Sequence, residues 1–158
     1  METISHAPAD YVCPFCLIAQ GASDPRPLTV AADIVYRDDL LTAFIGSGQW
    51  PRNPGHVIVI PNAHFENLFD LPVEYGTPIQ HLVRALAWAM KAEYGCAGIS
   101  TRQHNEPAGN QDVWHYHLHV FPRYEGDRLY QSDRARMPPE VRATYAARLR
   151  NHLQPRAI

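Results

Sequence analysis

The heptapeptide HYHLHVF occupies residues 115–121, and it is the most informative stretch of the chain. Its histidines, His115, His117 and His119, alternate with tyrosine, leucine and valine. Side chains alternate between the two faces of a β-strand, so the histidines share one face and the bulky residues share the other. The sequence therefore predicts a strand over residues 114–121, with histidines lining a pocket and apolar side chains packed against a helix.

Three kinds of site would place histidines in this pattern. The first is the polar face of a half-buried strand, although three histidines in strict alternation are unusual there. The second is a catalytic zinc site, in which three protein ligands leave a position open for the attacking water. The third is nucleophilic catalysis, because a neutral imidazole can attack phosphorus while its neighbours donate hydrogen bonds to phosphate oxygens.

The composition is that of a folded domain. Apolar residues form 46% and charged residues 19% of the 158 residues, which excludes a largely disordered chain. The formal net charge of −2 provides no basic field for nucleic acid or an anionic membrane. No apolar run approaches the ~20 residues that span a bilayer, and the first ten residues lack the pattern of a signal peptide. We expect a cytoplasmic protein with neither nucleic acid nor membrane as partner.

Turn residues and hydrophobic periodicity divide the chain into strands and helices within one domain, residues 1–158. We expect a flexible arm, a core, and a loop with a C-terminal helix over residues 1–10, 11–124 and 125–158. Strands are predicted over residues 34–36, 42–45, 57–60 and 97–102, and Pro122 is expected to end the histidine strand. One helix is predicted over residues 78–94, with Thr77 as N-cap and Gly95 as the stop. A final helix starts near Pro138 and presents on one face Val141, Tyr145, Leu149 and Leu153. This order of elements predicts an α+β fold with an antiparallel sheet.

The three cysteines are Cys13, Cys16 and Cys96. An odd number, with two of them in a Cys-x-x-Cys pair, favours a metal or thiol role over a disulfide framework. Cys-x-x-Cys is also half of a common zinc-binding motif, which two histidines can complete to a tetrahedron. Reduced, buried thiols are the alternative interpretation.

The alternating histidines resemble the signature of the histidine triad (HIT) superfamily of nucleotide hydrolases and transferases. Three further segments are similar to motifs of that family and follow in the family's order. Residues 105–114 resemble its glycine-rich loop, residues 55–64 resemble its Gly-His-strand-Pro segment, and residues 13–16 resemble a Cys-x-x-Cys variant. On these motifs the chain is identified as a member of the HIT superfamily.

The resemblance implies a five-stranded antiparallel sheet with one long helix and a C-terminal helix, and it implies a homodimer. It also implies a nucleotide hydrolase that cleaves at the α-phosphate of a nucleoside polyphosphate, such as a dinucleoside polyphosphate, or of a phosphoramidate. The reaction would pass through a covalent nucleotidyl-histidine. A nucleotidyltransferase or phosphorylase with the same nucleophile, a zinc-dependent metallohydrolase and a non-catalytic nucleotide-binding module remain as alternatives. No organic cofactor is expected.

The resemblance assigns catalytic roles to the three histidines. His117 would be the nucleophile, His119 would stabilise charge on the phosphate, and His115 would hold the network in register. His56 reads as a structural or surface residue. By the same resemblance, a structural zinc ion would be held by Cys13, Cys16, His64 and His115.

The resemblance also implies positions that contact the substrate. These positions are Gln111, Asn105, Phe15, Phe44 and Arg123. Gln111 and Asn105 fall where family members contact phosphate, Phe15 and Phe44 where they enclose the base, and Arg123 where a distal phosphate could lie. The chain departs from the family at Gly46 and Ser47, where many members carry an aspartate or asparagine for the ribose hydroxyls.

Overall fold

The computed structural model describes residues 4–21, 24, 26 and 28–153. The first three residues of the expected arm and the last five residues of the expected C-terminal segment lie outside this part of the chain. The helices are α1 (Pro14–Gln20), η1 (Ala31–Asp33), η2 (Val73–Tyr75), α2 (Gly76–Tyr94), η3 (Pro107–Gly109), η4 (Leu129–Gln131) and α3 (Pro139–Arg150). The strands are β1 (Ile34–Arg37), β2 (Leu41–Ile45), β3 (Gly48–Gln49), β4 (Val57–Pro61), β5 (Gly98–Gln103), β6 (Leu118–Arg123) and β7 (Ala135–Arg136).

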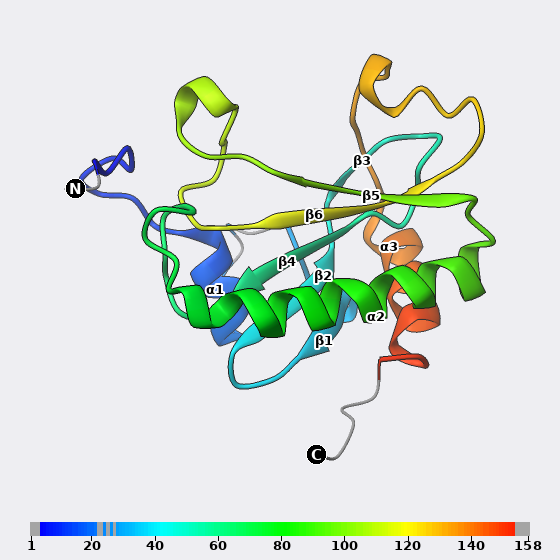
Figure 1. Ribbon diagram of the computed structural model, residues 1–158, viewed down its shortest axis with the longest axis horizontal. Helices are drawn as coiled ribbons and strands as arrows, with labels where there is room; N and C mark the ends of the chain where they lie inside the picture. Colours follow the sequence, from blue (N-terminus) through cyan, green and yellow to red (C-terminus); the bar gives the residue numbers. More distant parts are fainter. Residues whose placement is uncertain (1–3, 22–23, 25, 27, 154–158) are drawn as a thin grey trace.

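The main sheet has five strands in the order β1-β2-β4-β6-β5, and every neighbouring pair is antiparallel. Figure 1 shows the long helix α2 lying along this sheet, with α3 beside its C-terminal end. The predicted α+β fold with a five-stranded antiparallel sheet, one long helix and a C-terminal helix is confirmed. A small second sheet joins β3 to β7, which the sequence did not predict.

The strand predicted over residues 114–121 is wrong at its start, because β6 begins only at Leu118. The segment before it leaves the sheet, and there the N–H of Tyr116 donates to the carbonyl of Phe65 at 2.6 Å. The alternation of faces nevertheless holds, because Tyr116 packs in the apolar core while the three histidines lie on the other side of the chain.

Pro122 lies inside β6 and does not end it, contrary to the prediction. The carbonyl of the next residue, Arg123, accepts a hydrogen bond from the N–H of Ala97 at 2.8 Å beside β5. Pro122 therefore faces the opposite side, where its carbonyl accepts from Asn53 Nδ2 at 2.8 Å. The missing proline N–H costs no bond to β5, so the strand continues through it.

Helix α2 begins at Gly76, before the predicted N-cap Thr77. The 3₁₀ turn Val73–Tyr75 runs directly into the helix, so the chain is already helical when it reaches Thr77, and no side chain caps the start. The predicted C-terminal end of this helix is confirmed, because Gly95 follows its last residue and adopts the left-handed conformation at φ 63°. Within the described residues, none of the helices is both long and apolar enough to cross a membrane.

The face predicted for the last helix is confirmed in part, because Leu149 and Leu153 are buried and Tyr145 packs against the core, whereas Val141 is exposed. In the first turn of α3 the buried residue is Arg142, which is only 2% exposed, and Val141 is 37% exposed. The Arg142 guanidinium donates to Asp33 Oδ2 at 2.9 Å and to the carbonyls of Met137 and Leu28, each at 2.7 Å. These acceptors draw the arginine inward, an effect that apolar periodicity cannot reveal.

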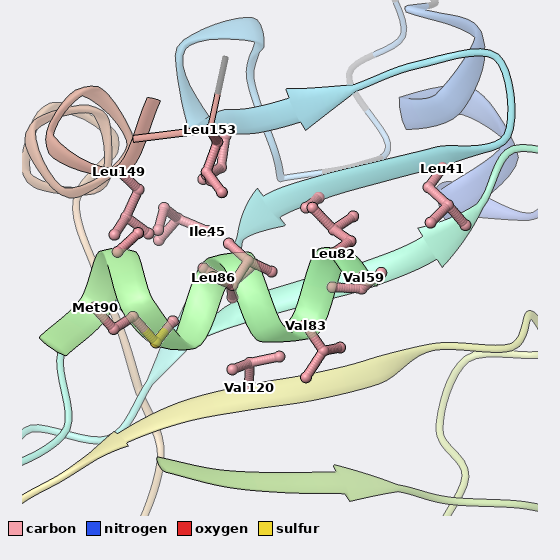
Figure 2. Close-up of a cluster of buried hydrophobic side chains, with 14 of the residues drawn as sticks. Leu41, Ile45, Val59, Leu82, Val83, Leu86, Met90, Val120, Leu149 and Leu153 are labelled. Atoms are coloured by element: carbon pink, nitrogen blue, oxygen red, sulfur yellow. The ribbon is translucent and has the colours of Figure 1, made fainter. Parts of the chain in front are cut away.

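The two faces of the sheet carry two different apolar clusters. The larger cluster packs between the sheet and helices α2 and α3, and Figure 2 shows Leu82, Leu86 and Met90 of α2 among it. The smaller cluster lies on the opposite face, where Phe15 and Ile18 of α1 pack with strand residues. The large core thus fixes the sheet, and the second face is left for a pocket beneath α1.

Candidate active site

A row of four side chains crosses the second face of the sheet. Phe44 of β2 is opposite Ile58 of β4, Ile58 is opposite His119 of β6, and His119 is opposite Arg102 of β5. Residues opposite one another in antiparallel strands project to the same face. The row therefore changes from apolar to polar and positively charged within four strands.

A cavity of about 240 Å³ lies between this face and α1. Apolar groups of α1 and the sheet form one part of its wall, and the rings of Phe15 and Phe44 meet edge to face with centroids 5.6 Å apart. Polar groups form the other part. The cavity is lined by Pro14, Phe15, Ile18, Arg26, Leu28, Thr29, Phe44, Ser47, Gly48, His56, Ile58, Asp112, Val113, His117, His119 and Arg134. Four residues that the sequence assigned to the site thus meet here, namely His117, His119, Phe15 and Phe44.

The protonation of His117 follows from its partner. Its Nδ1 lies 2.7 Å from the backbone carbonyl of His115, and a carbonyl can only accept, so Nδ1 carries the hydrogen. Burial lowers the pKa of His117 below its ordinary value, which keeps the ring neutral at pH 7. Nε2 therefore presents a lone pair, 3.8 Å from the carboxylate of Asp112. A neutral imidazole with a bare nitrogen in a pocket is a nucleophile.

His119 contacts another histidine, His56, which the sequence analysis interpreted as a structural or surface residue. His56, just before β4, is 2% exposed, and its Nε2 lies 2.8 Å from Nδ1 of His119. Burial, followed by the charge of Arg102, lowers the pKa of His56 to about 3. Burial also places the pKa of His119 well below its ordinary value. Both rings are neutral at pH 7, so a single hydrogen joins them.

His115 faces a different group of side chains. Its Nδ1 lies 3.3 Å from Cys13 Sγ and 3.5 Å from Cys16 Sγ, and Cys16 Sγ lies 3.2 Å from His64 Nδ1. The four potential ligand atoms all lie within 4.8 Å of one another. In a tetrahedral zinc site with Zn–S of about 2.3 Å and Zn–N of about 2.0 Å, sulfur and nitrogen ligands stand about 3.5 Å apart. This cluster can therefore hold a zinc ion.

The chemistry of the cluster also fits a cation. His115 Nε2 lies 2.9 Å from the carbonyl of Pro61, so Nε2 carries the hydrogen and Nδ1 keeps the lone pair that a metal needs. Burial, followed by the charge of Cys13, raises the pKa of Cys16 to about 12. Two thiolates this close are disfavoured unless a cation stabilises them. Among the described residues, His115 belongs to a cluster of potential metal ligands that does not include His117 or His119, so the triad by itself does not form such a cluster.

Gln111 does not line the cavity, and its side chain is fully engaged with the backbone. Its Nε2 donates to the carbonyls of Glu66 at 2.6 Å and Val113 at 2.9 Å, and its Oε1 accepts from the N–H of Glu106 at 2.9 Å. Gln111 thus holds the loop that carries Asp112 and Val113 into the cavity wall.

Asn105 and Arg123 also lie outside the cavity lining. Asn105 Oδ1 accepts from the N–H of Leu68 at 2.8 Å, and its amide exchanges hydrogen bonds with Gln103. Arg123 forms a two-pronged ion pair with Asp127, at 2.7 and 2.8 Å. The structure therefore does not bring these two residues together with the histidines.

Most residues of the cavity wall were not assigned to the site by the sequence analysis, and the polar ones among them include His56, Asp112 and Arg134. The Gly-His dipeptide before a buried strand was the one available signal, and it pointed to His56. Position 46 is a glycine, where the family resemblance led us to look for an aspartate or asparagine. The structure gives a steric reason, because a Cβ at this position would lie 2.9 Å from the ring of His56. A larger side chain at position 46 would displace that ring.

Comparison with known proteins places the chain in a family. The HIT domain model matches residues 28–126. Protein hit of Bacillus subtilis is 34% identical over 116 residues, which are 73% of this chain and 74% of that protein. The purine nucleoside phosphoramidase of Escherichia coli is 31% identical over 93 residues, which are 58% of this chain and 76% of that enzyme. The chain belongs to the HIT domain family.

A solved structure agrees with both the fold and the cysteine motif. The Zn-bound histidine triad family protein from Mycobacterium smegmatis matches with a TM-score of 0.70 and 28% identity. The match covers 88% of this chain and 94% of that protein. The resemblance stated from the sequence is thereby confirmed, and the Zn-bound relative fits the cluster of two cysteines and two histidines.

The contacts of Gln111 generate a first prediction. Gln111→Leu removes three hydrogen bonds and leaves the N–H of Glu106 and the buried carbonyl of Glu66 without the partners described above, so we expect the free energy of unfolding to fall by about 2 kcal/mol. Urea denaturation measures this loss, and Gln131→Leu on the exposed surface is the matched control. Unchanged stability combined with weaker nucleotide binding would instead support a direct phosphate contact by Gln111.

Proposed function

We propose that the protein is a nucleotide hydrolase that breaks a bond at the α-phosphate of a nucleoside polyphosphate or phosphoramidate through a covalent nucleotidyl-His117. The observation that carries this proposal is the neutral, buried His117, whose unprotonated Nε2 borders a cavity with an apolar wall. Membership of the HIT domain family and similarity to a purine nucleoside phosphoramidase support the substrate class.

The cavity suggests how a nucleotide is held. Its apolar part, with Phe15, Ile18 and Phe44, suits the flat faces of a base. Its polar part, with His117 and His119, then receives the α-phosphate. A substrate in this orientation spans the cavity from apolar wall to imidazoles.

The reaction proceeds in two displacements. The lone pair of His117 Nε2 forms a bond to the α-phosphorus, and the bond to the leaving group breaks with its electron pair on that group. The ring then bears a positive charge, which strengthens the hydrogen bond from Nδ1 to the carbonyl of His115. In the second step a water oxygen bonds to the phosphorus, and the bond from phosphorus to Nε2 breaks with its electron pair returning to Nε2. The water proton passes to solvent or to the leaving group, so the nucleoside monophosphate is released and the ring is neutral again. His119 stabilises the charge on the phosphate oxygens in both steps.

We propose that Cys13, Cys16, His64 and His115 bind a structural zinc ion. Four protein ligands leave no open position, so zinc here would supply rigidity and not a reactive water. It would fix the ring of His115, whose carbonyl orients His117. This division of roles favours the nucleophilic mechanism over a zinc-dependent metallohydrolase.

Two alternative functions remain: transfer of the nucleotidyl group to an acceptor other than water, and nucleotide binding without catalysis. A nucleotidyltransferase or phosphorylase would use the same His117 but pass the nucleotidyl group to phosphate or a metabolite, and product analysis with and without inorganic phosphate separates these reactions. A non-catalytic nucleotide-binding module would show no turnover. The homodimer and the cytoplasmic location stay predictions.

The role of His117 is tested by substitution. His117→Ala is expected to reduce turnover by at least about 10³-fold, because the nucleophile is lost, while the dissociation constant for the nucleoside monophosphate stays within a few fold. A panel of adenosine and guanosine polyphosphates and phosphoramidates serves as substrate, and calorimetry measures binding. His81→Ala, an exposed histidine of α2, is the control. Full turnover by the His117→Ala protein would contradict the mechanism.

The zinc proposal is tested by metal analysis. The purified protein is expected to hold about one zinc ion per chain, and Cys16→Ser is expected to lose it with a lower melting temperature. Cys96→Ala changes a cysteine outside the cluster and should keep the metal. If a chelator stops turnover at once in a protein that stays folded, the metallohydrolase reading is the correct one.

A further inference from the structure

A second cavity lies beside the one that contains the histidines. Its volume is about 280 Å³, and it is lined by Leu28, Ser47, Gly48, Arg134, Ala135 and Arg136. Most of these residues belong to the ribbon of β3 and β7 or flank it. The two cavities have in common Leu28, Ser47, Gly48 and Arg134. A ligand that occupies the first cavity can therefore extend to the lining of the second.

Gly48 makes room for two arginines on one side of this ribbon. It is opposite Arg136 in the pairing of β3 with β7, so a side chain at position 48 would lie on the same face as that of Arg136. A Cβ on Gly48 would also lie only 2.5 Å from Cδ and 2.9 Å from Cγ of Arg134. The side chain of Arg134 therefore lies directly against this glycine.

Hydrogen bonds hold the ribbon in place beside the main sheet. Gln49 of β3 accepts with Oε1 from the N–H of His56 at 2.9 Å, and its Nε2 donates to the carbonyls of Gly46 at 2.7 Å and His56 at 3.1 Å. The N–H of Met137, just after β7, donates to the carbonyl of Ser47 at 3.0 Å. The two arginines thus project from a backbone whose position is fixed before any ligand binds.

The lining of the second cavity suits an anion. The guanidinium groups of Arg134 and Arg136 and the hydroxyl of Ser47 can all donate hydrogen bonds, and no acidic residue of the described chain is part of the lining. A guanidinium presents several N–H groups in a planar fork that matches the oxygens of a phosphate. The ligand chemistry that fits this cavity is therefore a phosphate group bound by two arginines.

The two arginines are available to a ligand. Arg26, which lines the histidine cavity, already pairs with the carboxylate of Asp24 through both Nε and Nη2. Arg134 has a longer ion pair, with Asp112 at 3.6 Å, in which both side chains are 57% exposed. Exposed pairs of this kind are weak, so a phosphate can compete with the carboxylate. The described residues offer no ion pair to Arg136.

Asp112 shows how near Arg134 lies to the nucleophile. One oxygen of its carboxylate, Oδ1, lies 3.8 Å from Nε2 of His117, and the other, Oδ2, lies 3.6 Å from Nη1 of Arg134. A single carboxylate thus bridges the space between the imidazole and the guanidinium. A nucleotide with one phosphate at His117 and another a few bonds away can bridge the same space.

We propose that Arg134, Arg136 and the Ser47 hydroxyl hold a second phosphate of the nucleotide, other than the one that His117 attacks. The position of the first phosphate rests on the proposed function. The second phosphate belongs either to a ribose hydroxyl or to the chain beyond the α-phosphate, and it offers the same oxygens to the arginines in both cases. The proposal narrows the substrate class to nucleotides with at least two phosphate groups.

Binding measurements test this proposal without requiring turnover. Calorimetry compares a nucleoside 5′-monophosphate with the 2′,5′- and 3′,5′-bisphosphates and with the 5′-diphosphate, which is supplied as its non-hydrolysable methylene analogue. We expect at least one of these second phosphates to tighten binding by about 10-fold, because two guanidinium groups act on one phosphate. A gain with a bisphosphate assigns the second phosphate to the ribose, and a gain with the diphosphate assigns it to the chain.

Three variants connect the gain to the proposed residues. Arg136→Ala should remove most of the gain, because one of the two guanidinium groups is lost. Gly48→Ala keeps the net charge but places a Cβ where the side chain of Arg134 lies, so it should also reduce the gain. Arg84→Ala removes the same charge on the exposed side of α2 and should retain the gain. The gain is the ratio of two dissociation constants within one protein, so any effect of a variant on the first phosphate cancels.

Equal binding of all four ligands would overturn the proposal, and so would a gain that persists in full in Arg136→Ala or in Gly48→Ala. A gain that is lost in Arg84→Ala as well would also overturn it, since the gain would then reflect the overall charge of the protein. A protein that shows the gain, and loses it in Arg136→Ala, but turns over no nucleotide would contradict only the proposed function.

Discussion

The site depends on one hydrogen bond, from Nδ1 of His117 to the backbone carbonyl of His115 at 2.7 Å. This bond determines which nitrogen of His117 is bare, and therefore which atom can act as a nucleophile. The carbonyl is itself held in place, because the ring of His115 is fixed between the carbonyl of Pro61 and the cysteine cluster. The cluster of two cysteines and two histidines and the pocket are thus adjacent parts of one arrangement, joined by His115.

Backbone carbonyls orient His115 and His117, the ring of His56 contacts His119, and each histidine of the triad obtains a different role from its partner. His115 keeps a lone pair on Nδ1 for a metal, His117 keeps one on Nε2 for the pocket, and His119 shares a hydrogen bond with His56. Burial keeps these rings neutral by lowering their pKa values. The positive charge beside them comes from Arg102 and Arg134, which explains how a chain of net charge −2 can accommodate phosphates.

The sequence predicted those features that depend on local pattern. The alternation of residue types alone predicted that the histidines and the core residues lie on opposite sides of the chain. This prediction held although β6 begins only at Leu118, because the side chains of an extended segment alternate between two sides with or without a partner strand. The four expected zinc ligands and the two aromatic residues expected to enclose the base came from the family resemblance, and the structure brings each set together. Contacts between distant segments could not be predicted. His56 contacts His119 only because β4 pairs with β6, and Arg142 turns inward only because Asp33 lies beneath it.

The most direct test of the account is the chemistry of the covalent intermediate. Wild-type protein is mixed with a nucleoside polyphosphate and denatured within milliseconds, and the linkage is identified by peptide mapping and phosphorus resonance. The account predicts a nucleotidyl group on Nε2 of His117, since Nδ1 is engaged with the carbonyl of His115. A nucleotidyl group on Nδ1 or on another residue, or turnover without any covalent intermediate, would contradict it.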